Sequence, residues 1–268
     1  MKKKTVLDIM EMYDSGKKIT MLTAYDYVMA SILNEAETDM LLVGDTMGMV
    51  VYGQKTTLQV TLEDSIRHTQ AVARGAKSAM VIGDLPFGTF QVSREEAIKN
   101  SVKLMQLGRA EAIKLEGGSE RISAIEGILD AGIPVMGHLG LTPQSFHKFG
   151  GFKVQGRSEE TAKKLVEEAR ALEEAGIFSL VLEAIPWEVA KEITESISIP
   201  TIGIGAGPYC SGQVLVTYDM LGYFDFKAKF VKRYANLKDQ ILSAIQEYNK
   251  EVRNKSFPDL SYSYEMPK

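Results

Sequence analysis

The feature that most constrains the fold is a repeated alternation of short apolar runs with longer amphipathic segments. Each run is about four residues long and rich in β-branched or aliphatic side chains, which is typical of strands that are buried on both faces. There are eight such runs: Ile19–Leu22, Met40–Val43, Ala79–Ile82, Ala112–Leu115, Ile133–Met136, Leu180–Leu182, Thr201–Ile204 and Val214–Val216.

The segments between the runs carry helix signals. Thr61, Ser93 and Ser158 stand where helix N-caps are expected, and acidic residues follow each of them in the first turn. Strands that alternate with helices predict right-handed parallel crossovers. Eight such units in a chain of 268 residues favour an α/β fold of the closed (β/α)₈ TIM-barrel type over an open doubly wound sheet.

The two ends of the chain predict additional helices. A short amphipathic helix near the N-terminus, with Ile9 and Met10 on its apolar face, is expected to cap the barrel. A C-terminal helix is expected from Asp225 onward, followed by a polar tail over about residues 255–268. Because no stretch has the composition of a linker, residues 1–268 are predicted to form one domain.

Composition excludes several classes of protein. The 31 Lys and Arg residues and 35 Asp and Glu residues give a net charge of −4, which offers no general attraction to nucleic acid or an anionic membrane. A single cysteine, Cys210, excludes an intrachain disulfide and a Cys-based zinc cluster. No stretch of about 18 uncharged apolar residues occurs, so a transmembrane helix is not expected. We therefore expect a soluble cytoplasmic protein.

Polar side chains lie one or two residues after five of the apolar runs, at the point where barrel enzymes place their chemistry. Four carboxylates converging on one barrel mouth would repel one another unless a cation lies among them. Oxygen ligands without cysteine favour a hard cation such as Mg²⁺. The alternative is that these acids cap helices or face water. The five residues are Asp45, Asp84, Glu116, His138 and Glu183.

Three further features have two interpretations each. Lys114 and Glu116 share one face of a strand, so Lys114 either neutralises an anionic substrate or forms a structural ion pair with Glu116. Glu183 follows a very apolar run and is either a general base or a solvated loop acid. The glycines Gly205 and Gly207 either allow a ligand to approach the backbone closely or form a plain tight turn.

Six segments together resemble the 3-methyl-2-oxobutanoate hydroxymethyltransferase (ketopantoate hydroxymethyltransferase) family. They occur in the order and spacing of that family, from about Thr5 to the last helix. Any one of them is a weak signal, whereas six in order are specific. The segments are Thr23–Asp26, Val43–Met49, Gly83–Phe87, Lys114–Gly118, Gly137–Gln144 and Ile202–Gly207.

The resemblance implies a Mg²⁺-dependent (β/α)₈ barrel that assembles as a homo-oligomer, expected to be a decamer. Such an enzyme transfers a hydroxymethyl group from 5,10-methylenetetrahydrofolate to 3-methyl-2-oxobutanoate, through an enolate, and forms 2-dehydropantoate for pantothenate and coenzyme A synthesis. By position, the resemblance implies metal ligation by Asp45, Asp84 and Glu116, oxoacid binding by Asp45, Thr46, Asp84 and Lys114, catalysis by the general base Glu183, and supporting roles for His138, Gly205 and Gly207.

Some positions depart from the family pattern. Thr46 stands where the family commonly has Ser, and Tyr209, Ser211 and Tyr218 also differ from the expected residues. Two alternative functions are a Mg²⁺-dependent 2-oxoacid C–C lyase of the isocitrate lyase and phosphoenolpyruvate mutase type, and a non-catalytic barrel. The first normally carries a Lys-Lys-Cys-Gly-His type loop, whereas the single cysteine of this chain lies elsewhere. A non-catalytic barrel would be expected to have lost some of the strand-end acids.

Overall fold

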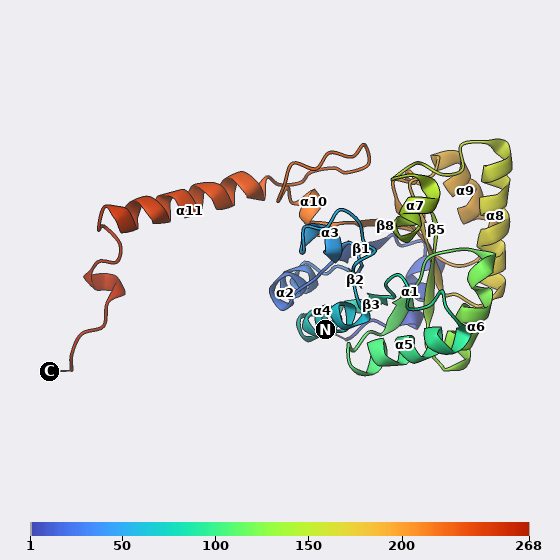
Figure 1. The fold of residues 1–268 in the computed structure, drawn as a ribbon, viewed down its shortest axis with the longest axis horizontal. Helices are drawn as coiled ribbons and strands as arrows, with labels where there is room; N and C mark the ends of the chain where they lie inside the picture. The colour runs from blue at the N-terminus through green and yellow to red at the C-terminus, as the bar shows by residue number, and fades with distance from the viewer. Residues whose placement is uncertain (1, 268) are drawn as a thin grey trace. The chain divides into compact units, whose positions relative to one another are not determined.

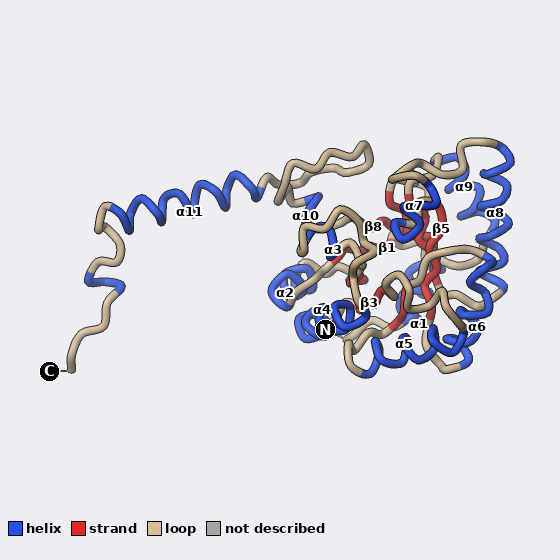
Figure 2. Tube along the Cα trace, viewed as in Figure 1, coloured by secondary structure: helices blue, strands red, loops and turns tan. Residues whose placement is uncertain are grey.

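Eight parallel strands form a closed barrel in the computed structural model, which describes residues 2–267. Each strand pairs with the next one along the chain, and the last pairs with the first, so the barrel predicted from the apolar runs is confirmed. Figure 2 shows the strands in red, enclosed by helices. The strands are β1 (Ile19–Thr23), β2 (Met40–Val43), β3 (Met80–Asp84), β4 (Ala112–Lys114), β5 (Val135–Gly140), β6 (Ser179–Glu183), β7 (Thr201–Ile204) and β8 (Gly212–Leu215).

The side chains of the strands divide between two hydrophobic clusters, because successive residues of a strand point to opposite faces. One cluster fills the barrel interior and includes Met21, Met40 and Ile82. The other lies between the strands and the helices and includes Ile113 and Leu180. Side chains continue to alternate between the two faces as far as the end of each strand. A polar residue two positions after an inward-pointing apolar residue therefore also points inward.

The N-terminal helix α1 (Val6–Asp14) closes the barrel interior at one end, as predicted for a capping helix. Ile9 and Met12 are buried and join the interior cluster. The sequence prediction placed Met10 on this face, but Met12 is the buried residue because positions three apart lie on one side of a helix. Thr5 accepts from the backbone N–H of Asp8, and the Asp8 carboxylate accepts from Thr5 in return, which fixes where α1 begins.

Helices surround the barrel on its outer side (Figure 1). Thr61, Ser93 and Ser158 are N-caps, as predicted, and each side chain accepts a hydrogen bond from the third backbone N–H of its helix. The longer helices are α2 (Tyr27–Glu35), α4 (Leu62–Gly75), α5 (Arg94–Gln106), α6 (Ile122–Asp130), α8 (Glu159–Glu174) and α9 (Trp187–Ser196). The short ones are α3 (Met47–Val50), α7 (Phe146–Phe149) and the 3₁₀ turns η1 (Ser119–Arg121) and η2 (Pro143–Ser145).

Residues 217–268 form a second compact unit, separate from residues 1–216. It holds α10 (Thr217–Met220), α11 (Leu237–Arg253) and the 3₁₀ turn η3 (Leu260–Tyr262). The prediction of a helix from Asp225 is wrong over its first twelve residues, which form a loop before α11 begins. The expectation of one domain over residues 1–268 stays a prediction.

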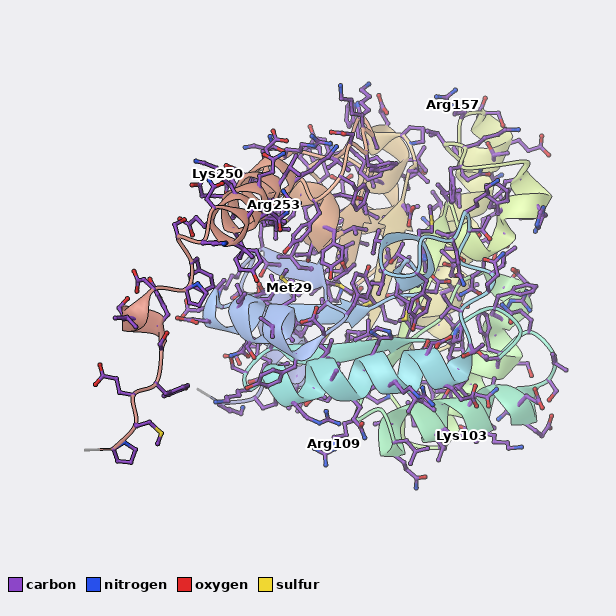
Figure 3. The ribbon with its side chains drawn as sticks, turned by 60° about the vertical axis from the view of Figure 1, so that its left-hand side comes forward. Met29, Lys103, Arg109, Arg157, Lys250 and Arg253 are labelled. Atoms are coloured by element: carbon purple, nitrogen blue, oxygen red, sulfur yellow. The ribbon has the colours of Figure 1, made fainter. Side chains whose placement is uncertain are left out.

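Aromatic rings organise part of this second unit. Phe257 lies in the segment predicted as a polar tail, yet its ring packs edge-on against Tyr248 of α11 and also contacts Tyr262. In α11 the last turn carries the basic side chains Lys250 and Arg253 (Figure 3), which suits the negative end of the helix dipole. None of the helices described between residues 2 and 267 has the length and apolarity that a bilayer span requires.

Candidate active site

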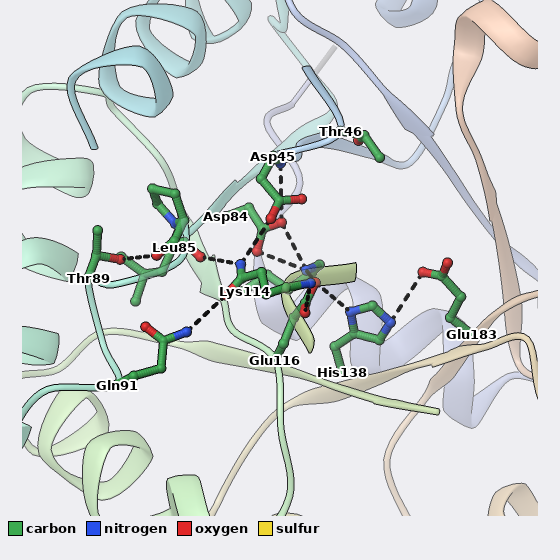
Figure 4. Close-up of polar contacts among 12 residues, drawn as sticks. Asp45, Thr46, Asp84, Leu85, Thr89, Gln91, Lys114, Glu116, His138 and Glu183 are labelled. Atoms are coloured by element: carbon green, nitrogen blue, oxygen red, sulfur yellow. Dashed lines mark hydrogen bonds and ion pairs between the residues drawn. The ribbon is translucent and has the colours of Figure 1, made fainter. Parts of the chain in front are cut away.

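The strand ends bring the predicted polar residues together at the carboxyl end of the barrel (Figure 4). Asp84, Lys114 and His138 continue the inward-facing rows of β3, β4 and β5, and each is at most 3% exposed. Glu183, at the end of β6, is the more accessible group, since its side chain is 18% exposed. The cluster therefore consists of buried charges with one acid nearer to solvent.

Asp84 and Lys114 form the strongest pair of the cluster. They lie side by side in the register of β3 and β4, and the Lys114 Nζ donates to Asp84 Oδ1 at 2.8 Å and Oδ2 at 2.9 Å. Glu116 Oε1 is farther from the same Nζ, at 3.9 Å. The ion pair with Glu116 that was one interpretation of Lys114 is therefore the weaker contact, and Asp84 is its main partner.

Negative charge exceeds positive charge in the cluster. Burial raises the pKa of Asp45 well above its ordinary value, and the neighbouring carboxylates of Asp84 and Glu116 raise it further. Burial also raises the pKa of Asp84, against the opposing charge of Lys114. Burial disfavours a charge on Lys114, but Asp84, Glu116 and Asp45 together raise its pKa. One lysine faces three carboxylates, so an additional cation would relieve their repulsion.

His138 lies between two carboxylates. Its Nδ1 is 3.6 Å from Glu116 Oε1, and its Nε2 is 3.3 Å from Glu183 Oε2. Burial and the charge of Lys114 lower the pKa of His138, but these two carboxylates outweigh them and raise it to about 9. At neutral pH the imidazole is therefore protonated and interacts with both acids. His138 connects the buried carboxylates to the more exposed Glu183.

The donor set fits a hard cation that keeps other ligands. Among residues 2–267, no three His, Cys, Asp or Glu side chains form a ready-made metal cage. Mg²⁺ does not need one, since it commonly takes one or two carboxylates and completes its shell with water or substrate oxygens. Asp45 and Asp84 supply two such carboxylates, and the backbone N–H of Asp45 lies 3.4 Å from Asp84 Oδ2. Glu116 Oε1 is buried without a hydrogen-bond partner in the described chain, as a group awaiting a ligand would be.

The remaining predicted residues lie around this cluster. The Thr46 hydroxyl is 3.0 Å from the hydroxyl of Tyr25. Thr46 follows Asp45 in the chain, and both side chains are labelled in Figure 4. Gly205 and Gly207 both have positive φ, at 63° and 80°. A Cβ added at Gly207 would overlap the Cβ of Trp187, so packing within the chain explains this glycine. A ligand contact at either glycine stays a prediction.

Apart from Thr46, two barrel positions that depart from the family pattern, Ser211 and Tyr209, have their contacts outside the cluster. Ser211 exchanges hydrogen bonds of 3.2 Å with Thr201, the first residue of β7, at the opposite end of the strand from the site. The ring of Tyr209 packs on that of Trp187, with a centroid distance of 5.3 Å. Tyr218 belongs to the second unit, where its ring stacks on Tyr223.

Gln144 is a site residue to which sequence reasoning assigned no role. Its Nε2 donates to Asp45 Oδ2 at 3.0 Å and to the carbonyl of Leu85 at 2.9 Å, while its backbone N–H donates to Glu116 Oε2 at 3.0 Å. It was missed because only positions one or two residues after each apolar run were considered, whereas Gln144 lies four residues beyond β5. The available signal was that Gln144 ends Gly137–Gln144, one of the six segments that resemble the family.

A cavity of about 180 Å³ opens beside the cluster. Glu116 and Gln144 form part of its wall, and Phe87, Gln91 and Lys148 are among its other lining residues. A small molecule in this cavity would therefore be in contact with the buried carboxylate side of the site.

The fold and the site define a (β/α)₈-barrel enzyme with a buried cluster of carboxylates, lysine and histidine at its mouth. Solved structures share this fold. Phosphonopyruvate hydrolase is similar with a TM-score of 0.63 at 13% identity, covering 99% of this chain and 92% of that one. A 2,3-dimethylmalate lyase of the phosphoenolpyruvate mutase and isocitrate lyase superfamily has a TM-score of 0.61 at 16% identity, covering 98% and 91%. At such identities the likeness concerns the fold alone.

Sequence comparison defines the particular family. The family model described as ketopantoate hydroxymethyltransferase matches residues 3–260. The 3-methyl-2-oxobutanoate hydroxymethyltransferase of Ignicoccus hospitalis is 53% identical, covering 98% of this chain and 99% of the relative. That of Syntrophomonas wolfei is 56% identical, covering 90% and 88%. The chain belongs to the ketopantoate hydroxymethyltransferase family, which confirms the family and the transferase class that its motifs predicted.

Proposed function

We propose that the chain transfers a hydroxymethyl group from 5,10-methylenetetrahydrofolate to C3 of 3-methyl-2-oxobutanoate and forms 2-dehydropantoate for pantothenate and coenzyme A synthesis. The observation that carries the proposal is the row of contacts in which His138 lies between Glu116 and Glu183. It sets one partly exposed carboxylate, 3.3 Å from a protonated imidazole, beside a buried group of oxygen donors. Removal of a weakly acidic C–H proton needs both a base and stabilisation of the charge that develops.

The buried residues bind and orient the oxoacid. The Lys114 ammonium, held in place by Asp84, provides a fixed positive charge for the substrate carboxylate. Asp45 and Thr46 lie next to one another at the end of β2, where the Thr46 hydroxyl is held by Tyr25. Asp45 and Asp84, with Glu116 nearby, would hold Mg²⁺, which when bound supplies a Lewis acid that stabilises negative charge on the enolised oxoacid.

Glu183 acts as the general base. Because His138 Nε2 lies at Oε2 of Glu183, the other carboxylate oxygen remains available for the C3 proton. The electron pair of the C3–H bond passes into the enolate. C3 then forms a bond to the methylene carbon of the folate as one of the two C–N bonds of that carbon breaks, and the released nitrogen takes up the proton from Glu183. One water supplies the hydroxyl oxygen as the second C–N bond breaks, and its proton goes to the second nitrogen, so the products are 2-dehydropantoate and tetrahydrofolate. His138 orients the Glu183 carboxylate during proton removal.

The proposal includes assembly and location. We expect a homo-oligomer, a decamer by resemblance to the family, which acts in the cytoplasm on these small molecules and binds neither nucleic acid nor membrane. Sedimentation velocity of the purified chain tests the assembly, and a stable monomer at micromolar concentration would contradict it.

Product formation tests the reaction. Purified protein is incubated with 3-methyl-2-oxobutanoate, 5,10-methylenetetrahydrofolate and Mg²⁺, and 2-dehydropantoate is measured by mass spectrometry. We expect the product only when all three are present. Absence of product with all three present, from a protein that binds the oxoacid, would contradict the proposed function.

A further inference from the structure

We propose that Gln144 is a positioning residue that determines which carboxylate oxygens are presented to the divalent cation. The inference rests on the proposed Mg²⁺ site and extends it to a residue outside the ligand set. Gln144 lies in η2, beyond the end of β5, and is 6% exposed.

The side chain of Gln144 uses both ends of its amide. Nε2 donates to Asp45 Oδ2 at 3.0 Å and to the carbonyl of Leu85 at 2.9 Å, and Oε1 accepts from Gln91 Nε2 at 3.0 Å. The reversed amide would place Oε1 against two acceptors, the Asp45 carboxylate and the Leu85 carbonyl. The surroundings therefore permit one orientation of the amide.

The backbone of Gln144 holds a second carboxylate. Its N–H donates to Glu116 Oε2 at 3.0 Å, so one residue fixes one oxygen on each of two acids from different strand ends. Gln144 donates to neither of the opposite oxygens, Asp45 Oδ1 and Glu116 Oε1, and Glu116 Oε1 lies 3.6 Å from His138 Nδ1. Glu116 Oε1 has no hydrogen-bond partner in the described chain and lies 3.9 Å from the Lys114 Nζ.

Gln91 supports this arrangement from the loop after β3. Its amide donates to Gln144 Oε1, and both residues line the cavity beside Glu116. Partners that orient metal ligands typically change metal affinity or activity by about 10–100-fold when they are removed. Loss of the Gln144 amide should therefore weaken cation binding, whereas loss of Gln91 removes only its support and should have a smaller effect.

The experiment measures Mn²⁺ binding by electron paramagnetic resonance, with the full-length protein and no substrate. Gln144→Met keeps side-chain length but removes the amide, and Gln70→Met on α4 is the matched control, since Gln70 faces the outer surface beside Leu107. We expect the Kd for Mn²⁺ to rise about 10–100-fold in Gln144→Met, and to be unchanged in Gln70→Met. Thermal unfolding should show that both variants are folded.

Two further variants keep the test decisive if Gln144→Met does not fold. Gln144→Asn retains the backbone N–H at Glu116 but draws the amide away from Asp45, and should raise the Kd about 10-fold. Gln91→Met should raise it less than Gln144→Asn. Wild-type Mn²⁺ affinity in a folded Gln144 variant would overturn the positioning role. No Mn²⁺ binding by the wild-type protein would instead overturn the metal site on which the inference rests.

Discussion

His138 Nε2 lies 3.3 Å from Glu183 Oε2, and this contact joins the most accessible acid of the site to its buried centre. The same imidazole faces Glu116 through Nδ1 at 3.6 Å. The ring of His138 therefore lies between the two carboxylates and connects them. In the proposed mechanism, this contact orients the carboxylate that acts as the general base.

Glu183→Gln should abolish exchange of the C3 proton of 3-methyl-2-oxobutanoate with deuterated water, because an amide cannot accept that proton. We expect a loss of at least about 100-fold in exchange rate, with oxoacid affinity largely retained. Proton NMR measures the rate of exchange, and calorimetry measures the affinity for the oxoacid. Glu188→Gln, at an exposed position of α9, is the control and should exchange normally. Undiminished exchange in Glu183→Gln would remove Glu183 as the base.

Asp84 and Lys114 should show strong coupling in the free energy of unfolding. Asp84→Asn leaves a buried ammonium without its nearest carboxylate, which typically costs about 3–5 kcal/mol. Lys114→Met removes that charge, so the double variant should be destabilised by less than the sum of the single effects, by at least about 1 kcal/mol. The free energy of unfolding is measured in urea without Mg²⁺ for the wild type, the two single variants and the double variant. Additive effects would contradict the pairing.

The Thr46 hydroxyl should contribute to oxoacid binding. Thr46→Val has nearly the same volume but loses the hydroxyl that contacts Tyr25, and should raise KM for the oxoacid about 10-fold, as expected for one lost hydrogen bond in a polar site. Thr46→Ser keeps the hydroxyl and should stay close to wild type. Steady-state kinetics distinguishes the two variants, and an equal KM for Val and Ser would show that the hydroxyl has no role in binding.

Gly207→Ala should destabilise the barrel more than Gly132→Ala does. Both glycines have φ near +80°, so both substitutions incur about 1–2 kcal/mol of backbone strain. Only at Gly207 would the new methyl group overlap Trp187, which adds about 1–3 kcal/mol for overpacking. Trp187 is the only tryptophan, so its fluorescence reports urea unfolding at this locus. Equal destabilisation of the two variants would contradict the packing explanation.

The barrel could be predicted from the sequence because its strands are short, apolar and separated by helix signals. Thr201–Ile204 was predicted residue for residue as β7, and the inward alternation beyond Ile82 carries Asp84 into the site. The crossover from β7 to β8 differs from the predicted alternation of strands and helices, since residues 205–211 connect these two strands without a helix. Seven residues are too few for a helix and two turns, so the chain passes directly from one strand to the next.

Pairings inside the site could not be predicted, because they depend on register between strands that are far apart in sequence. Lys114 meets Asp84 rather than Glu116 because β3 and β4 align those two residues. Gln144 reaches Asp45 across 99 positions of the chain, through a turn after β5 that no periodic pattern describes. The strand-end residues were predictable as a set, whereas their partners required the three-dimensional structure.

Metal-dependent exchange at C3 tests the central claim most directly. Protein treated with EDTA and dialysed is mixed with 3-methyl-2-oxobutanoate in deuterated water, with or without Mg²⁺ and without folate, and NMR follows the C3 proton. The account predicts exchange with Mg²⁺, little without it, and none in Glu183→Gln under either condition. Exchange that is equally fast with and without Mg²⁺, or that persists in Glu183→Gln, would contradict it.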